Sequence, residues 1–445
     1  MAGARSAALK ALLRVDGQAG YSNLVLDSAL ESARLGDRDR ALATAIFYGV
    51  LEKQITLDYI VGLFSRLPVG KLSPAVREIL RVGVYQIRYM EKIPPSAAVN
   101  ECVTLAKENG ESRAAGFVNA VLRGMLRNPG KIRLPEEKKD PVRYRSILYS
   151  CPEELVAFWR KCYGPAAADE ILEGSASKPD IFIRVNNTRI TEQQLMERLR
   201  SEGIAAQLAP WPEGALRVTE NAGRLLRSPC FGEGLFHVED ISSQFCCSVV
   251  GPKPGERVVD VCAAPGGKTF TLAERMENRG EVVSCDVSPR RVGLIADGAA
   301  RLGLSAVKAR VRDAADSKEE LPQAARVLCD VPCSGLGAIR RKPEIRYKFP
   351  ATLDSLPNLQ YRILCRSAGL VENGGVLVYS TCTLSPAENG EVAGRFLAEN
   401  ESFVPLAFSP PEGVVRGEDE PENQLTLFPG RGGPDGFFIS AFRKR

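Results

Sequence analysis

The stretch VVDVCAAPGGKT, residues 258–269, decides how the second half of this chain folds. Its first residues are apolar and rich in valine, which is typical of a short buried strand. The two glycines predict a tight turn between that strand and a helix, and such turns bring backbone N–H groups close to a ligand. The stretch therefore predicts a strand, a turn and a helix, with a ligand site at the turn.

Similar short apolar segments recur along the chain, with helical stretches between most of them. We expect these strands at residues 258–262, 281–286, 306–311, 326–331 and 375–380. A Pro/Gly-rich surface loop at 409–436 is expected before a last strand at 436–442. Strands that are buried on both faces and joined by helices indicate a doubly wound α/β sheet.

In the N-terminal part of the chain, the apolar residues recur with a different period. Within residues 5–128, apolar side chains recur at the spacing of one helix face, for example at Leu57, Ile60, Val61 and Phe64. Several such stripes with short gaps between them predict a bundle of five to seven amphipathic helices.

Two segments separate the bundle from the sheet. Residues 129–145 contain three prolines and many charges, so we expect a linker there, and a short helix near 152–173. Residues 180–185 and 215–219 are typical of strands, with a helix at 191–202 between them, capped by Thr191. This pattern predicts a small α+β unit.

The charge of the chain is unevenly distributed. Residues 1–150 hold 23 lysines and arginines against 15 aspartates and glutamates, a net charge of +8, and the remainder has a net charge of −3. A basic front half favours a polyanionic partner. A solvated helical surface with a chance excess of bases explains the numbers equally well.

Composition excludes several classes of protein. The chain of 445 residues has 12 cysteines without a C-x-x-C pair, and His237 is its one histidine. A zinc site or a hydrolase that depends on several histidines is therefore not expected. We find neither an apolar run of about 18 residues nor a secretory signal, so we expect reduced thiols in the cytosol.

Four consecutive predicted strands end in the glycine turn or in an aspartate, at Asp286, Asp313 and Asp330. In open α/β sheets, ligands bind at this edge. The turn is not a nucleotide P-loop, because Cys262 stands where the first glycine belongs, and it lacks the G-x-G-x-x-G of dinucleotide sites. A nucleoside cofactor without a pyrophosphate needs only a tight turn and a carboxylate that binds its ribose. S-adenosylmethionine is the cofactor that fits this pattern best. Two alternatives to cofactor binding remain. In one, Asp313 caps a turn, and in the other, Asp286 faces solvent.

Two cysteines follow the fourth and fifth strands, Cys333 in DVPCSG and Cys382 in YSTCT. Both are therefore expected at the cofactor edge. A thiolate is a strong nucleophile, and a positive neighbour lowers the pKa of a thiol. The candidate neighbours are Lys268, Arg340, Arg341 and Lys342.

These segments carry a resemblance to a known family. The stretches VDVCAAPGGKT (259–269), LCDVPCSGLGAIRRKPEIRYKF (328–349) and GGVLVYSTCTLSPAENGE (374–391) are similar to the signature motifs of the Nol1/Nop2/Sun RNA cytosine-5 methyltransferases. The segment GLFHVEDISSQFCC (234–247) resembles the lead into that domain. The front resembles the antitermination factor NusB in IPPSAAVNECVTLAK (93–107) and FVNAVLRGMLRN (117–128).

A NusB-like front joined to this catalytic domain resembles the bacterial 16S rRNA cytosine-5 methyltransferases. The resemblance implies a multi-domain chain with an all-α NusB-like RNA-binding bundle at 1–130 and a basic linker and helical segment at 131–174. It further implies a small α+β, RRM-like or ferredoxin-like unit at 175–233 and an α/β Rossmann-like class I methyltransferase domain at 234–445. The small unit either helps to deliver RNA or is structural padding.

The resemblance also implies residue roles. Cys382 would attack C6 of the cytosine, Cys333 would assist loss of the C5 proton and release of the RNA, and Asp330 would bind the edge of the base. Lys268 would face the target base. The implied cofactor-binding residues are Cys262, Ala263, Ala264, Pro265, Gly266, Gly267, Lys268, Asp286, Asp313 and Asp330.

The implied partner is 16S rRNA with an unpaired or flipped-out cytosine, bound by a monomer without a metal or a membrane. Residues 113–145 could track phosphates or form a solvated linker, and the basic residues of 340–348 could hold flanking nucleotides. A tRNA cytosine-5 methyltransferase and a catalytically dead RNA-binding or antitermination protein are the alternatives. Retention of both cysteines argues against a dead enzyme.

Overall fold

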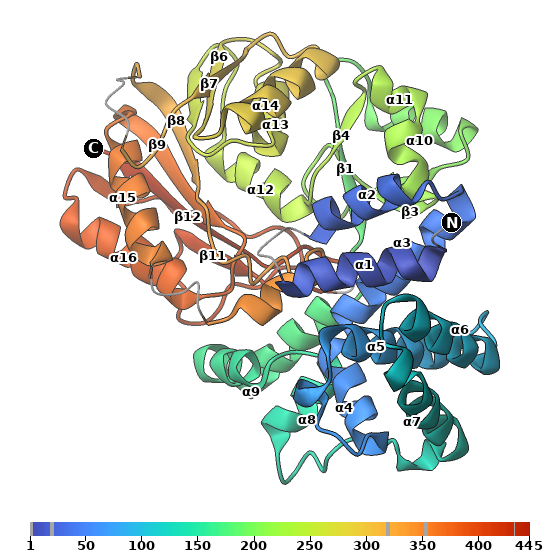
Figure 1. The fold of residues 1–445 in the computed structure, drawn as a ribbon. Coiled ribbons are helices and arrows are strands. Elements are labelled where there is room, and N and C mark those ends of the chain that lie inside the picture. Colours follow the sequence, from blue (N-terminus) through green and yellow to red (C-terminus); the bar gives the residue numbers. More distant parts are fainter. Residues whose placement is uncertain (1–2, 18–21, 317–320, 351–354, 431) are drawn as a thin grey trace. The chain divides into compact units, whose positions relative to one another are not determined.

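A computed structural model describes residues 3–17, 22–316, 321–350, 355–430 and 432–445. The chain divides into two compact units. The first comprises Met1–Ala176 with Ile339–Pro350, and the second comprises Ser177–Ala338 with Ala351–Arg445. Figure 1 colours the first unit mainly blue to teal and the second green to red.

The first unit is helical, as its periodicity predicts, and the apolar stripes of its first seven helices form one core. Its helices are α1 (Ala4–Gly17), α2 (Ser22–Ala33), α3 (Asp37–Glu52), α4 (Gln54–Phe64), α5 (Pro74–Tyr89), α6 (Pro95–Glu108), α7 (Ala115–Arg127), α8 (Pro141–Tyr149) and α9 (Glu153–Ala176). The start of α5 shows how neighbouring residues determine where a helix begins. The Ser73 hydroxyl accepts from the backbone N–H of Val76, and Pro74 occupies the first turn.

The predicted linker at 129–145 is only partly a linker. Its last residues form the start of α8, where the Asp140 carboxylate accepts from the backbone N–H of Arg143. Asp140-Pro141 is thus a helix start of the same type as Ser73-Pro74. The sequence did not predict this helix start, because the many prolines and charges of the segment are also typical of a linker.

A segment far along the sequence belongs to the helical unit. Arg346 is 3% exposed, and its guanidinium donates to the carbonyl oxygens of Glu52, Tyr149 and Ser150 at 3.4, 3.2 and 3.0 Å. A positive group at the C-terminal ends of α3 and α8 complements the dipoles of both helices. Arg346 is therefore a structural residue, and the expectation that it holds nucleotides is wrong.

The second unit contains a small antiparallel sheet with the strand order β2-β3-β1-β4. Its elements are β1 (Ile181–Val185), α10 (Glu192–Ser201), β2 (Ala205–Leu208), β3 (Ala215–Glu220) and β4 (Phe236–Val238). β1, α10 and β3 match the prediction, and α10 begins with a full capping box between Thr191 and Gln194. The sequence reading missed the short strands β2 and β4, and β4 lies beyond the boundary predicted at residue 233.

The large sheet of the same unit has the order β10-β12-β9-β8-β5-β6-β7, and β11 pairs with β12. The strands are β5 (Arg257–Asp260), β6 (Glu281–Asp286), β7 (Val307–Val311), β8 (Ala324–Asp330), β9 (Val371–Thr381), β10 (Phe403–Pro405), β11 (Gln424–Leu427) and β12 (Phe437–Lys444). β5 to β9 run parallel to one another, whereas β12 is antiparallel to β9. β11 lies inside the predicted loop at 409–436, which is therefore not irregular throughout.

Helices cover both faces of this sheet (Figure 1). The helices are α12 (Ile241–Val250), α13 (Gly267–Arg275) and α14 (Pro289–Leu302) on one face, and α15 (Leu356–Ala368) and α16 (Gly390–Glu399) on the other. Successive strand residues alternate between the two cores: Val258 packs under α13, and Val259 packs on the opposite side. The doubly wound architecture is confirmed.

Candidate active site

The carboxyl ends of the parallel strands enclose a cavity of about 400 Å³. Five of the predicted cofactor residues line it, namely Cys262, Ala264, Asp286, Asp313 and Asp330. The remaining ones, Ala263, Pro265, Gly266, Gly267 and Lys268, complete the turn that leads into α13. The topology therefore brings the predicted cofactor residues to one edge of the sheet.

The glycine turn has the conformation that its residues dictate. Gly266 has a φ of 116°, and a Cβ there would lie 2.4 Å from the ring of Phe270. No other residue fits this position without displacing that ring. The turn is anchored to the sheet because the backbone N–H of Ala263 donates to the carbonyl oxygen of Cys285 at 2.7 Å.

The two aspartates at the far side of the cavity differ. Asp286 is buried; its Oδ1 accepts from the backbone N–H of Ser288 at 2.9 Å, and its Oδ2 lies 3.1 Å from Arg291. Asp313 is exposed and accepts from the backbone N–H of Ala315 at 2.8 Å. Asp313 thus caps a turn and also lines the cavity, while Asp286 does not face open solvent.

Lys268 and Asp330 form an ion pair next to the cavity. The Lys268 Nζ lies 2.9 Å from Asp330 Oδ2, and the Ser380 hydroxyl donates to Asp330 Oδ1 at 2.8 Å. Burial alone would lower the pKa of Lys268, but the charges of Asp330, Cys246 and Glu239 and the hydrogen bond to Asp330 together raise it. The sequence suggested Lys268 as the partner of a thiolate, whereas its charge is committed to Asp330.

The two predicted cysteines meet. Cys333 and Cys382 are both partly exposed, and their sulfur atoms lie 3.2 Å apart, although 49 residues separate them in the chain. The side-chain contact with Cys382, burial, and the charges of Cys382 and Glu388 together raise the pKa of Cys333 well above its ordinary value. Two thiols in contact at the cofactor edge can act in turn on one substrate atom or on two neighbouring ones.

The sequence reading missed two buried carboxyl groups at this edge. Asp260 ends β5 and accepts from the Thr269 hydroxyl at 2.8 Å, and burial raises its pKa to about 7. Glu388 accepts from the backbone N–H of Ser334, next to Cys333. Both lie within the quoted motifs, but nothing in their spacing distinguishes a buried acid from a solvated one.

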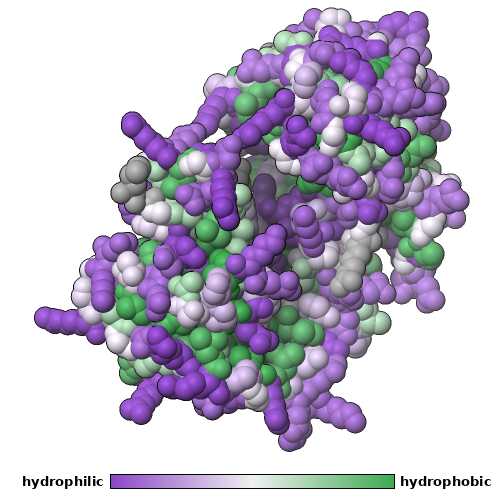
Figure 2. Space-filling model, turned by 90° about the vertical axis from the view of Figure 1, so that its right-hand side faces the viewer, coloured by the Kyte–Doolittle hydropathy of each residue, from purple (hydrophilic) through white to green (hydrophobic). Residues whose placement is uncertain are grey.

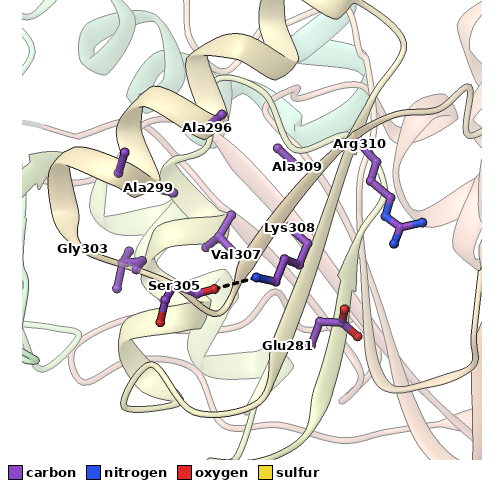
Figure 3. Close-up of a pocket in the computed structure, with 11 residues that line it drawn as sticks. Glu281, Ala296, Ala299, Gly303, Ser305, Val307, Lys308, Ala309 and Arg310 are labelled. Atoms are coloured by element: carbon purple, nitrogen blue, oxygen red, sulfur yellow. Dashed lines mark hydrogen bonds between the residues drawn. The ribbon is translucent and has the colours of Figure 1, made fainter.

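A larger groove of about 800 Å³ lies elsewhere on the sheet (Figure 3). It is lined by Glu281 at the start of β6, by Val307 at the start of β7 and by small residues of α14. In Figure 3 the Lys308 ammonium donates to the carbonyl oxygen of Ser305, at 3.1 Å. This groove runs along the edge strand β7 from its amino end and beside α14, and it shares no residue with the cavity at the carboxyl ends of the strands.

The fold and the site define a class, the Rossmann-like methyltransferases, here joined to a helical bundle and a small antiparallel sheet. Family models match the chain in three places: the NusB family at residues 2–127, the RsmF/B-like ferredoxin-like domain at 151–223, and the 16S rRNA methyltransferase RsmB/F at 247–443.

Curated relatives match over the whole length. A probable ribosomal RNA small subunit methyltransferase B from Bacillus subtilis is 39% identical over 99% of this chain and 98% of its own. A ribosomal RNA small subunit methyltransferase B from Pseudomonas syringae is 32% identical over 99% of this chain and 96% of its own. The chain therefore belongs to the RsmB/F family of 16S rRNA methyltransferases.

Solved structures agree on the fold. The crystal structure of PH0851 covers 98% of both chains with a TM-score of 0.81 at 24% identity, and this likeness shows the fold alone. A methyltransferase homologue from Pyrococcus horikoshii has a TM-score of 0.60 at 27% identity, over 69% of this chain and 99% of its own.

The cofactor of this family is S-adenosylmethionine, and the cavity fits it. A glycine turn without a P-loop, a buried carboxylate at Asp286 and a volume of about 400 Å³ suit a nucleoside cofactor that lacks a pyrophosphate. Within the described residues, no cluster of three or more His, Cys, Asp or Glu side chains is arranged to hold a metal ion. Among the described helices, none has the length and apolar character needed to cross a membrane.

Proposed function

We propose that this methyltransferase modifies C5 of a cytosine in 16S rRNA through a transient bond between Cys382 Sγ and C6 of the base. The observation that supports it is the contact of the Cys333 and Cys382 sulfur atoms, at 3.2 Å, in loops that follow β8 and β9. C5 of cytosine is a weak nucleophile, so a methyltransferase acting there requires a nucleophilic group of its own.

The residues have separate roles in this mechanism. The Cys382 thiolate adds to C6, which converts the C5–C6 double bond into an enamine whose C5 is nucleophilic. Asp330, oriented by Lys268 and Ser380, accepts from the cytosine edge and favours a proton at N3. S-adenosylmethionine, when bound, supplies the electrophilic methyl group. Cys333 then assists the loss of the C5 proton to water, and the bond between C6 and Cys382 breaks, which regenerates the Cys382 thiolate.

The target base must be unpaired or flipped out of a helix, because C6 is not accessible to a thiolate within a stacked duplex. We assign phosphate binding to the exposed cations of the helical unit, which include Arg113, Arg127 and Arg143. On the face shown in Figure 2, hydrophilic side chains project over much of the surface. We further propose that the protein acts on rRNA as a monomer in the cytoplasm.

The test is methylation of purified 16S rRNA and tRNA transcripts by the full chain, followed by mass spectrometry of the nucleosides. We expect 5-methylcytidine in the 16S transcript and none in tRNA. A methyl group on another atom or base contradicts the proposal. Modification of tRNA alone favours the tRNA alternative, and RNA binding without methylation favours a dead enzyme.

A further inference from the structure

One buried carboxylate connects the two cysteine loops. Glu388 is fully buried in the short 3-10 helix Pro386–Glu388 that follows β9. Its Oε2 accepts from the backbone N–H of Ser334 at 2.9 Å, and its Oε1 accepts from the Ser334 hydroxyl at 2.6 Å. Oε1 also accepts from the Thr383 hydroxyl at 3.4 Å. Ser334 follows Cys333 and Thr383 follows Cys382, so one side chain holds the neighbours of both sulfur atoms.

This carboxylate is itself held in place from two further elements. Gln360 of α15 donates from one amide nitrogen to Glu388 Oε2 at 2.9 Å and to the carbonyl oxygen of Pro332 at 3.0 Å. The Tyr379 hydroxyl of β9 donates to the backbone carbonyl of Glu388 at 2.6 Å. The sheet and α15 therefore fix the position of Glu388. Glu388, together with the hydrogen bond of 2.7 Å between the Ser334 and Thr383 hydroxyls, holds the two loops.

The chemistry of these contacts distinguishes Glu388 from a surface acid. The side-chain donors named above are hydroxyl and amide groups, which satisfy a buried carboxylate without neutralising its charge. That charge is one of the causes that raise the pKa of Cys333. A change at Glu388 thus has two separable effects, on the positions of the loops and on the ionisation of a thiol.

We propose that Glu388 is a positioning residue for methyl transfer, which holds the Cys333 and Cys382 loops at a fixed separation so that both sulfur atoms reach one cytosine. The inference rests on the proposed cysteine mechanism. Glu388 acts through Ser334 and Thr383, and it needs no contact with the substrate.

Two variants and a control test this role in the full chain. Glu388→Ala removes every side-chain acceptor, whereas Glu388→Gln keeps the shape and one acceptor oxygen but removes the charge. Glu399→Gln is the matched control, since Glu399 is exposed on α16 and pairs with Arg395. The assays are kcat and KM with a 16S rRNA transcript, S-adenosylmethionine affinity by calorimetry, and the pH–rate profile.

Displaced loops should affect turnover more than binding. We expect Glu388→Ala to lower kcat about 100-fold while KM and cofactor affinity change less than about 3-fold. Glu388→Gln should return kcat to within about 10-fold of the wild type, since it keeps part of the hydrogen bonding. It should also shift the acidic limb of the pH–rate profile to lower pH, because a thiol without a negative neighbour ionises more easily. Glu399→Gln should match the wild type in every assay.

A normal kcat in Glu388→Ala would overturn the proposal. So would a Glu388→Gln variant with both a wild-type kcat and an unmoved acidic limb, which also decides the question if the alanine variant does not fold. Cys382→Ala is measured in parallel. If it still methylates RNA, the cysteine mechanism itself fails; if it is inactive while both Glu388 variants behave as wild type, only the positioning role fails.

Discussion

The sulfur atoms of Cys333 and Cys382 lie 3.2 Å apart at the carboxyl ends of β8 and β9. At this separation, two thiols can serve consecutive steps on adjacent atoms of one base. The arrangement follows from the topology, because β8 and β9 are parallel neighbours whose registered ends, Asp330 and Ser380, stand side by side. The loops after these strands are therefore brought together wherever the sheet forms.

Asp286 is expected to hold the ribose of the cofactor. Asp286→Ala should weaken S-adenosylmethionine binding by about 1.5–3 kcal/mol, the usual effect of losing a hydrogen bond to a charged group. Calorimetry measures the change, with Asp297→Ala as a control because Asp297 is an exposed aspartate of α14. An unchanged affinity in Asp286→Ala would place the ribose elsewhere.

His237 is expected to affect stability and not catalysis. It is buried, with Glu274 at 3.4 Å and Glu239 at 3.5 Å. Burial alone would lower the pKa of His237, but the charges and hydrogen bonds of Glu274 and Glu239 raise it to about 9.

A histidine whose pKa is raised on folding contributes stability fully below its unfolded pKa of about 6.5, and this contribution is lost as the pH rises through 9. The wild type should therefore lose about 3 kcal/mol between these pH values, and His237→Gln should lose less. Urea unfolding at several pH values measures this difference. The pH–rate profile of the variant should keep its shape, and loss of one of its limbs would assign His237 a catalytic role.

The helical unit is expected to supply salt-dependent RNA affinity. Neutralising Arg113, Arg127 and Arg143 with glutamine should make the slope of log affinity against log salt shallower by about 2, at about 0.7 for each phosphate contact to single-stranded RNA. The control neutralises three exposed arginines of the other unit, Arg200, Arg290 and Arg395. Equal effects of the two sets, or no effect of the first, would contradict the assignment.

Substitutions are a better test of RNA binding than deletion of the front half. A chain that begins near residue 152 lacks Glu52, Tyr149 and Ser150, whose carbonyl oxygens receive the guanidinium of Arg346. In such a chain the guanidinium of Arg346, in the segment that follows the Cys333 loop, would lose these hydrogen-bond partners. It would then be either exposed to solvent or buried without a partner for its charge. Its loss of activity would then have two causes that cannot be separated.

Local signals in the sequence predicted much of the fold. β6 has the predicted bounds, and the capping residue Thr191 marks the start of α10, because both depend on residues close in the chain. Strands β2 and β4 were not predicted from the sequence, because each has only three or four residues and its apolar pattern is too short to recognise. The division into four domains at residues 130, 174 and 233 stays a prediction.

Side-chain partners across the site could not be predicted in the same way. The ion pair of Lys268 with Asp330 joins residues 62 apart, and the bond from Ser334 to Glu388 spans 54. Lys268 was therefore expected beside a thiolate, and Glu388 was overlooked. The edge of the sheet at which Cys333 and Cys382 meet was predictable, because the ends of parallel strands share an edge whatever their partners are.

The central claim, that Cys382 is the nucleophile and Cys333 serves release, is tested most directly on a denaturing gel. Cys382→Ala and Cys333→Ala are each incubated with S-adenosylmethionine and labelled 16S rRNA transcript, beside the wild type. We predict that Cys333→Ala accumulates a protein–RNA adduct that survives denaturant, because attack proceeds and release fails. Cys382→Ala should form no adduct and no methylated product. An adduct with Cys382→Ala and none with Cys333→Ala would reverse the two roles and contradict the account.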